Sequence, residues 1–171
     1  MAINQEPNIH ELVICSNIFV RKDGKYLLLK RSDKKKFAPG VVHPFGGKLD
    51  NNENAFIGAQ RELFEEAGIN VENMRLEAVL LEITPVREMY NNWLIFHFSA
   101  DYKSGEIIKT KEGEAIVLSE DEILKQNLFP SVRQVIKNIL NPNDGTIFAT
   151  FKFDENGNII EKENNINICS V

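Results

Sequence analysis

The chain has 171 residues, of which 43% are hydrophobic and 26% are charged, and its formal net charge is -5. We expect one domain over residues 1–171 with a core of its own, and frayed ends at 1–10 and 161–171. The acidic balance argues against a binder of duplex nucleic acid, which usually presents a basic face. No apolar run is long enough to span a membrane and no signal-type start is present, so we expect a cytoplasmic protein without a membrane partner.

The first part of the chain predicts a hairpin followed by loops. Apolar segments at 12–20 and 26–29 flank Asp23-Gly24, and glycine accepts the positive φ that a tight hairpin turn needs. Lys30 to Lys36 is a basic run for which we favour a solvated loop, with a basic rim that attracts a polyphosphate as the alternative. Residues 37–49 are rich in proline and glycine and predict a loop.

The segment from Asn54 to Ala67 predicts an amphipathic helix, because its small and apolar residues recur mostly at intervals of three and four. Gly68 is expected to end this helix in the left-handed conformation. The helix places three carboxylates close together, and like charges at this spacing repel each other. They are the side chains of Glu62, Glu65 and Glu66. Mg²⁺ binds through carboxylate and phosphate oxygens, so it is the leading candidate for the compensating cation, and Mn²⁺ is the alternative.

The second half of the chain predicts strands at 75–83, 93–102, 110–118 and 146–153. Apolar residues on both faces of 75–83 indicate a sheet that is covered on both sides. A capping box at 119–122 predicts a short helix, and Pro130 begins a second helix that Asn141-Pro142 stops. We therefore expect an α/β layered fold.

Three connections between these elements are predicted from turn residues. A loop is expected between Pro85 and Asn92, and a turn at 103–105. Asn156-Gly157 is expected to turn the chain into 159–160, which makes a late hairpin.

The segment from Gly47 to Ile69 matches, position by position, the signature of the Nudix hydrolases, G-x5-E-x7-R-E-[apolar]-x-E-E-x-G-[apolar], and we call it the Nudix box. The resemblance implies a mixed sheet between helices, an α/β/α sandwich. The chain departs from the commonest family pattern, in which a proline directly precedes the two glycines and a tryptophan lies upstream. Phe45 intervenes here, and His43 lies near where an aromatic residue is often found.

The resemblance also implies roles for single residues. The metal would be held by the carbonyl of Gly46 and by the three glutamates, Glu62, Glu65 and Glu66, while Arg61 and Glu53 would form an ion pair that fixes the loop against the helix. Nudix enzymes often take a further metal ligand or the catalytic base from a glutamate outside the box. Glu114 is our choice for it and Glu112 the fallback, and the base stays open between Glu114 and the box glutamates.

The implied activity is Mg²⁺-dependent hydrolysis of a diphosphate linkage in a small nucleotide. Phe45 to Lys48 resembles the branch that hydrolyses oxidised purine nucleoside triphosphates, so a nucleoside triphosphate cleaved to monophosphate and pyrophosphate is the first choice. ADP-ribose or another nucleotide sugar is the runner-up, and a sensor that binds nucleotides without hydrolysis is the third hypothesis. The residues expected to contact substrate are Arg31, His43, Phe45, Lys48, Trp93 and His97. For Trp93 and His97 the ordinary alternative is a place in the core.

Overall fold

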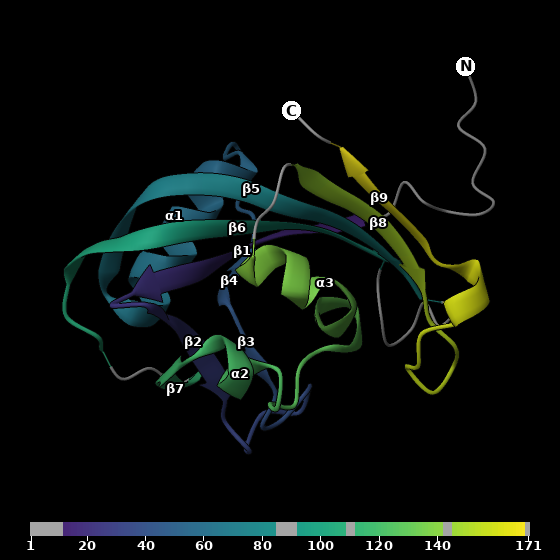
Figure 1. Cartoon of the computed structure of the whole chain (residues 1–171), viewed down its shortest axis with the longest axis horizontal. Helices are drawn as coiled ribbons and strands as arrows, with labels where there is room; N and C mark the ends of the chain where they lie inside the picture. The colour runs from purple at the N-terminus through teal and green to yellow at the C-terminus, as the bar shows by residue number, and fades with distance from the viewer. Residues whose placement is uncertain (1–11, 85–91, 109–111, 142–144, 170–171) are drawn as a thin grey trace.

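The computed structural model describes residues 12–84, 92–108, 112–141 and 145–169 (Figure 1). Its strands are β1 (Leu12–Lys22), β2 (Lys25–Arg31), β3 (Val42–His43), β4 (Phe45–Lys48), β5 (Ile69–Ile83), β6 (Asn92–Gly105), β7 (Gly113–Leu118), β8 (Thr146–Lys152) and β9 (Asn165–Cys169). Its helices are α1 (Ala55–Ala67), α2 (Glu120–Ile123) and α3 (Pro130–Leu140), with a 3-10 turn at Glu161–Glu163. None of these described helices is long and apolar enough to cross a membrane.

All the described strands join one mixed sheet, in the order β3-β2-β1-β6-β5-β8-β9, with β4 paired to β1 and β7 paired to β2. The β1–β6 and β5–β8 pairs are parallel, and the others are antiparallel. Figure 1 shows α1 on one side of this sheet and α3 on the other. The predicted α/β/α sandwich of Nudix type is therefore confirmed.

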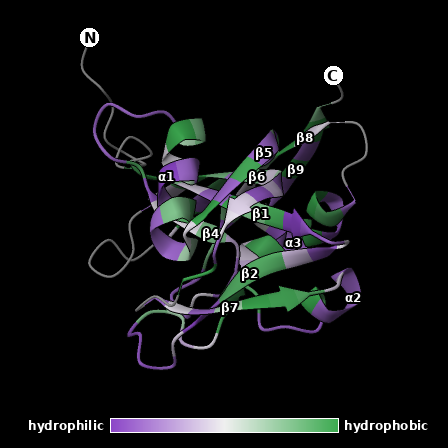
Figure 2. Ribbon diagram, turned by 90° about the vertical axis from the view of Figure 1, so that its left-hand side faces the viewer, coloured by the Kyte–Doolittle hydropathy of each residue, from purple (hydrophilic) through white to green (hydrophobic). Residues whose placement is uncertain are grey.

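Two hydrophobic clusters pack against the two faces of the sheet. Successive side chains of a strand point to opposite faces, so Ile18 of β1 lies in the cluster beneath α1, whereas Phe19 lies in the cluster beneath α3. We call these the α1 face and the α3 face. Figure 2 shows long hydrophobic stretches along β1, β2 and β7, which supply both clusters. The alternation tells us toward which helix each described strand residue points.

Local signals correctly predicted the elements that carry the Nudix box. Asp23 and Gly24 have φ values of 51° and 73° and join β1 to β2 in the predicted hairpin. The side chain of Asn54 accepts hydrogen bonds from the amides of Phe56 and Ile57 and so caps the start of α1. Gly68, with φ of 70°, ends the helix. The predicted capping box at 119–122 and the Pro130 helix start are also present.

Strands β5 and β6 are longer than predicted. Residues 103–105 do not form a turn, because Gly105 pairs with Ile69 at the end of β6. The register of this pair shifts at three places between Asn70 and Ala78, which marks bulges in β5. Bulges break the regular alternation of polar and apolar residues, so the sequence pattern did not indicate a strand before residue 75.

The end of the chain also differs from the prediction. Residues 165–169 are not a frayed tail but form β9, which pairs antiparallel with β8. The expected hairpin at 156–157 forms only one bridge, between Phe153 and Ile159. Residues 37–49 hold the short strands β3 and β4 rather than a continuous loop. The predicted loop at 85–91 and the stop at Pro142 lie outside the described residues, as do residues 1–11.

Candidate active site

Strand β4 brings two glycines against the carboxylates of α1. The amide of Gly46 donates a hydrogen bond to Oε2 of Glu66 at 3.0 Å. Gly46 has φ of 146°, and a Cβ there would lie 2.1 Å from the carbonyl oxygen of Ser16. A Cβ on Gly47 would lie 2.6 Å from the carboxyl carbon of Glu62. Gly46 is therefore needed for the close approach of β4 to β1, and Gly47 for its close approach to α1.

Arg61 of α1 ties the helix to the loop that precedes it. Its Nε donates to Glu53 Oε2 at 3.1 Å and its Nη2 donates to Glu53 Oε1 at 2.6 Å. Nη2 also donates to the carbonyl oxygen of Lys48 at 3.1 Å. This is the ion pair that the family resemblance implies, in a bidentate geometry that favours arginine over lysine. The hydrogen bonds from Arg61 lower the pKa of Glu53.

The same guanidinium holds two of the three box glutamates. Nη1 of Arg61 donates to Glu62 at 3.0 Å and to Glu65 at 3.4 Å. The Glu62 side chain is 17% exposed and that of Glu65 is 59% exposed, so Glu65 reaches into solvent while Glu62 lies against Gly47. Each of the three carboxylates thus contacts Arg61 or the Gly46 amide, and Glu62 and Glu66 lie against β4.

Burial makes the negative charge of this group unfavourable. Burial raises the pKa of Glu66 to about 7. The charges of Glu62 and Glu112 raise this pKa further, whereas the hydrogen bond from the Gly46 amide lowers it. Burial also raises the pKa of Glu62, although Arg61 counteracts it. Carboxylates that share one half-buried site are therefore incompletely compensated by the protein itself. This is the electrostatic setting in which a bound cation is stabilising.

The donor chemistry of the site fits a hard divalent cation. Carboxylate and carbonyl oxygens are the ligands that Mg²⁺ takes from proteins, and Gly47 of the glycine strand lies directly against the Glu62 carboxylate. In the described part of the chain, no three His, Cys, Asp or Glu side chains are close enough together to hold an ion without moving. Glu62 and Glu65 would have to turn from Arg61 toward an ion near Gly46.

The structure favours Glu112 over Glu114 as the carboxylate outside the box. Glu114 of β7 pairs with Lys30 of β2 and lies two residues before Ile116, whose side chain packs into the α3-face cluster. Because side chains alternate along a strand, Glu114 also points toward the α3 face and away from α1. Glu112 lies near enough to Glu66 to raise its pKa, and it accepts a hydrogen bond from Lys35 at 2.6 Å. The fallback assignment therefore agrees with the geometry, whereas Glu114 is not brought to the group.

Two of the residues expected to contact substrate are enclosed in the cores. Phe45 is 0% exposed in the α1-face cluster, where it lies opposite Ile18. His97 is 0% exposed on the α3 face, with its ring 5.8 Å from that of Phe19. As placed, neither side chain can touch a ligand, because alternation along β4 and β6 turns them inward. For His97 the alternative of a core position holds.

The remaining candidates lie around the α3 face and the end of β2. The ammonium of Lys48 lies 5.6 Å above the ring of Trp93, which makes a cation–π contact. The buried ring of His43 meets that of Phe129 edge-on, with 6.2 Å between the centroids. Arg31 donates from Nε to the carbonyl oxygen of Phe37 at 3.3 Å. Among these candidates Lys48 and Trp93 are in contact, whereas His43 and Arg31 have other partners.

Sequence reasoning missed a polar pair on the α3 face. The hydroxyl of Ser131, at the start of α3, donates to Oε1 of Glu82 on β5, and burial raises the pKa of that carboxyl. Glu82 pairs with Trp93 across β5 and β6, so the two side chains are neighbours. The available signal was Glu82 itself, a glutamate within the apolar run from Val79 to Ile83, because a glutamate is rarely buried unless it is paired.

Buried His97 and His43 predict a pH dependence of stability. Burial lowers the pKa of His97 to about 3 and that of His43 to about 4, the latter with help from Arg31 and against Glu112. Below pH 6.5 the unfolded chain binds protons that the folded chain does not, so stability falls as the pH decreases. Each histidine contributes a slope of about 1.4 kcal/mol per pH unit.

We expect the variant His97→Gln to lose less stability than the parent between pH 7 and pH 5, by about 2 kcal/mol. Urea unfolding at the two pH values measures this difference. The raised pKa values of Glu66 and Glu82 make the folded chain more stable as the pH decreases, but this effect is the same in the parent and the variant. Equal losses in parent and variant would show that His97 does not stay neutral in the folded chain.

Fold and site together define a Nudix-type domain, an α/β/α sandwich in which a glycine strand lies against a carboxylate-bearing helix. The family model of the NUDIX domain matches residues 12–139, and the chain belongs to this family. Among solved structures, the Mutator MutT protein of Bacillus halodurans has a TM-score of 0.79 at 23% identity, covering 91% of this chain and 98% of that one. An ADP-ribose pyrophosphatase of Streptococcus suis has a TM-score of 0.58 at 20% identity, covering 83% and 98%. At these identities the likeness shows the fold alone.

Two characterised relatives carry different substrate names. The NAD-capped RNA hydrolase NudC of Haemophilus influenzae is 32% identical over 97 residues, which are 56% of this chain. The oxidized purine nucleoside triphosphate hydrolase of Mus musculus is 30% identical over 98 residues, which are 57% of this chain. The chain spans only 34% of the length of the first relative and 61% of the second.

Proposed function

We propose that the chain is a Mg²⁺-dependent hydrolase of a diphosphate linkage in a nucleotide, with a nucleoside triphosphate as the first substrate and nucleoside monophosphate and pyrophosphate as products. The observation that carries the proposal is the Arg61 assembly. One guanidinium holds Glu53, Glu62 and Glu65, while Glu66 is held by the Gly46 amide. Family membership supports it, because both relatives named above are hydrolases of nucleotide-containing compounds.

The proposed roles follow from the geometry of the site. Glu62, Glu65, Glu66 and the carbonyl of Gly46 would hold the cation. When bound, Mg²⁺ would screen the phosphate charges and make a water molecule more acidic. Glu112 would accept the proton of the attacking water, and its contact with Lys35 and its effect on the pKa of Glu66 support this role.

Two residues would hold this arrangement in place rather than take part in the chemistry. Arg61 and Glu53 would keep α1 and the preceding loop in register, so that the glycines stay against the carboxylates. Both are therefore proposed as positioning residues.

The nucleoside end of the substrate is proposed to meet the α3 face. Trp93 offers a half-exposed aromatic ring beside Lys48, and Glu82 offers a carboxyl group with a raised pKa. Aromatic rings stack on bases, and a carboxyl group can pair with the polar edge of a purine. This arrangement supports a purine nucleotide, and the mouse relative's name supports an oxidised purine as the first compound to test.

A panel of nucleotides with Mg²⁺ tests the proposal. We expect release of nucleoside monophosphate and pyrophosphate from at least one purine nucleoside triphosphate, with the products separated by anion-exchange chromatography, and no release in EDTA. The panel includes ADP-ribose, because a pyrophosphatase for it shares this fold. Tight binding of one nucleotide without release from any would instead support a sensor.

A further inference from the structure

The last described strand of the chain lies at an open edge of the sheet. Strand β9 follows β8 at the end of the strand order, and within the described residues β8 is the only strand that pairs with it (Figure 1). All five residues of β9 are exposed. One side of its backbone therefore presents N–H and C=O groups to which no described strand is paired.

Strand β9 lacks the features that usually protect such an edge. Its sequence, Asn-Ile-Asn-Ile-Cys, contains no charged residue and no proline. Its register with β8 runs from Asn165 to Cys169 without a shift, so no bulge turns the edge away. An edge that is extended, uncharged and regular is a template on which a further strand can pair.

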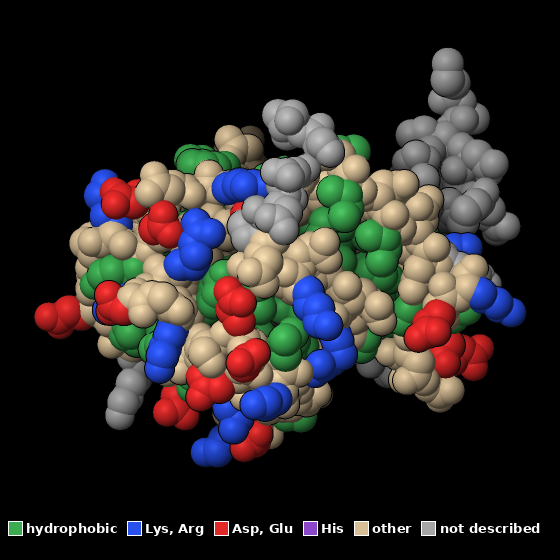
Figure 3. All heavy atoms as spheres, in the orientation of Figure 1, with side chains coloured by type: hydrophobic (Ala, Val, Ile, Leu, Met, Phe, Trp, Pro, Cys, Tyr) green, Lys and Arg blue, Asp and Glu red, His purple; other side chains and the backbone are tan. Residues whose placement is uncertain are grey.

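The isoleucines of β9 add an apolar surface to this edge. Ile166 and Ile168 are 47% and 53% exposed, and they lie opposite Ala149 and Ile147, which belong to the α3-face cluster. Both isoleucines therefore continue the α3 face outward, while the asparagines point to the other face. Figure 3 shows hydrophobic side chains gathered over β8 and β9. This apolar surface has no cover among the described helices and strands.

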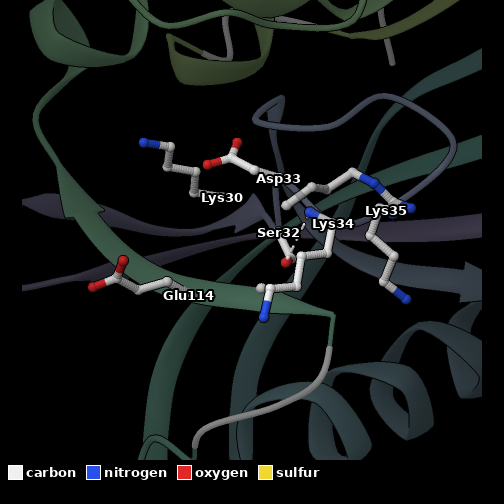
Figure 4. Close-up of a pocket in the computed structure, with 8 residues that line it drawn as sticks. Lys30, Ser32, Asp33, Lys34, Lys35 and Glu114 are labelled. Atoms are coloured by element: carbon white, nitrogen blue, oxygen red, sulfur yellow. Dashed lines mark hydrogen bonds between the residues drawn. The ribbon is translucent and has the colours of Figure 1, made fainter.

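Charge distinguishes this edge from the opposite end of the sheet. There, where β2 ends and β7 begins, Lys30, Asp33, Lys34 and Glu114 line a hollow (Figure 4). The chain has a formal net charge of -5, so two copies repel each other unless they meet at an uncharged surface. Strand β9 is such a surface, and it offers no opposite charge to an acidic or basic partner. A second copy of the chain is therefore the partner that this edge fits.

We propose that two copies of the chain pair antiparallel through β9, about a two-fold axis at Asn167. In this register Ile166 lies opposite Ile168 of the partner subunit, and Asn167 lies opposite the partner's Asn167. Apolar side chains then meet on the α3 face and amides meet on the other face, as a self-complementary interface requires. A shift by one residue would place isoleucine opposite asparagine, so the pattern of β9 specifies the register.

The pairing joins two sheets into one and leaves the Nudix box open. Strands β8, β5 and β6 separate β9 from β1, on which β4 and its glycines lie. The α3 faces of the two copies would lie on the same side of the joined sheet. The inference does not depend on the proposed function. A contact of five residues is small, so we expect a dissociation constant of roughly micromolar order.

Disulfide formation at the two-fold axis tests the register. Opposite residues of an antiparallel pair have Cα atoms about 4.5–5.5 Å apart, which a disulfide can bridge. In a Cys169→Ser background, which leaves the buried Cys15 as the other thiol, Asn167→Cys should give a disulfide-linked dimer on mild oxidation. The matched control Ile166→Cys should not, because residue 166 of each copy lies opposite residue 168 of the other. Equal cross-linking of both variants, or none by Asn167→Cys, overturns the inference.

Sedimentation equilibrium measures the same contact without a cross-link. We expect Ile168→Lys to raise the dissociation constant of the dimer about tenfold or more, because lysine on an edge strand opposes pairing. The control Ile57→Lys makes the same exchange at a half-exposed isoleucine of α1 and should keep the parent's constant. A parent that stays monomeric throughout the micromolar range, or a dimer that Ile168→Lys leaves intact, overturns the inference. Neither measurement uses catalysis, so failure to hydrolyse any nucleotide would refute only the proposed function.

Discussion

Replacing Glu66 with glutamine is expected to lower kcat/KM about a thousandfold while the protein stays folded. Glu66 is the box glutamate that accepts the Gly46 amide, and glutamine can still accept that hydrogen bond while it loses the negative charge. Charge stabilisation by a metal site contributes several kcal/mol, and a thousandfold loss corresponds to about 4 kcal/mol. Kinetics with Mg²⁺ and the best nucleotide of the panel measure the loss.

The control for this variant is Glu72→Gln, which changes the same side chain at an exposed position of β5. It should keep the parent rate. A folded Glu66→Gln protein with the parent rate would remove Glu66 from the metal site. Glu65→Gln is expected to behave as Glu66→Gln does, because it also removes one proposed ligand.

Thermal unfolding in EDTA gives an independent measurement on the same variant. The pKa of Glu66 is about 7 in the folded chain and near 4.5 in the unfolded chain, so ionisation between these values costs stability as the pH rises. Glu66→Gln should therefore melt at a higher temperature than the parent at pH 8, and the gain should be smaller at pH 5. A carboxylate whose ionisation destabilises the folded chain is typical of a functional site.

The parts of the fold that the sequence predicted are those with local causes. Helix α1 has a capping side chain at Asn54, a regular apolar period and a glycine at its end, and each acts within a few residues. The β1–β2 hairpin was predicted from Asp23-Gly24 between two apolar runs. Local chemistry of this kind needs no knowledge of the rest of the fold.

The elements that sequence reasoning missed depend on distant partners. Strand β9 is exposed throughout and pairs with the edge of β8, and the alternation of asparagine and isoleucine at 165–168 was its available local signal. Residues 103–105 carry turn-type residues, yet they continue β6 because Ile69 lies opposite Gly105. At residues 103–105 tertiary pairing overrides the local preference for a turn.

In the candidate site too, some contacts were predictable from the sequence and others depend on distant partners. The resemblance to the Nudix signature was enough to predict the contact of Arg61 with Glu53. Choosing between Glu112 and Glu114 required the folded chain, because Glu114 lies within β7 on the α3 face, whereas Glu112 precedes that strand and is held by Lys35. The pair of Glu82 and Ser131 joins a strand to a helix 49 residues later, so only the folded chain shows it.

Arg61→Lys is expected to be the most damaging exchange of one cation for another in this chain. Lysine keeps the charge but has a single donor group, whereas Arg61 donates to Glu53 through two nitrogens and also reaches Glu62 and the Lys48 carbonyl. We expect kcat to fall about a hundredfold and KM to change little, because a positioning residue acts on the alignment of the catalytic groups.

A double-mutant cycle with Glu53→Gln shows whether Arg61 acts through this partner. If the ion pair is the unit that positions the loop, the double variant Arg61→Lys/Glu53→Gln should be about as slow as the worse single variant, because the second change removes nothing further. Independent roles predict that the two losses in kcat multiply instead. The second result would mean that Glu53 contacts the ion or the substrate directly, and that the loop before α1 is part of the chemistry rather than its support.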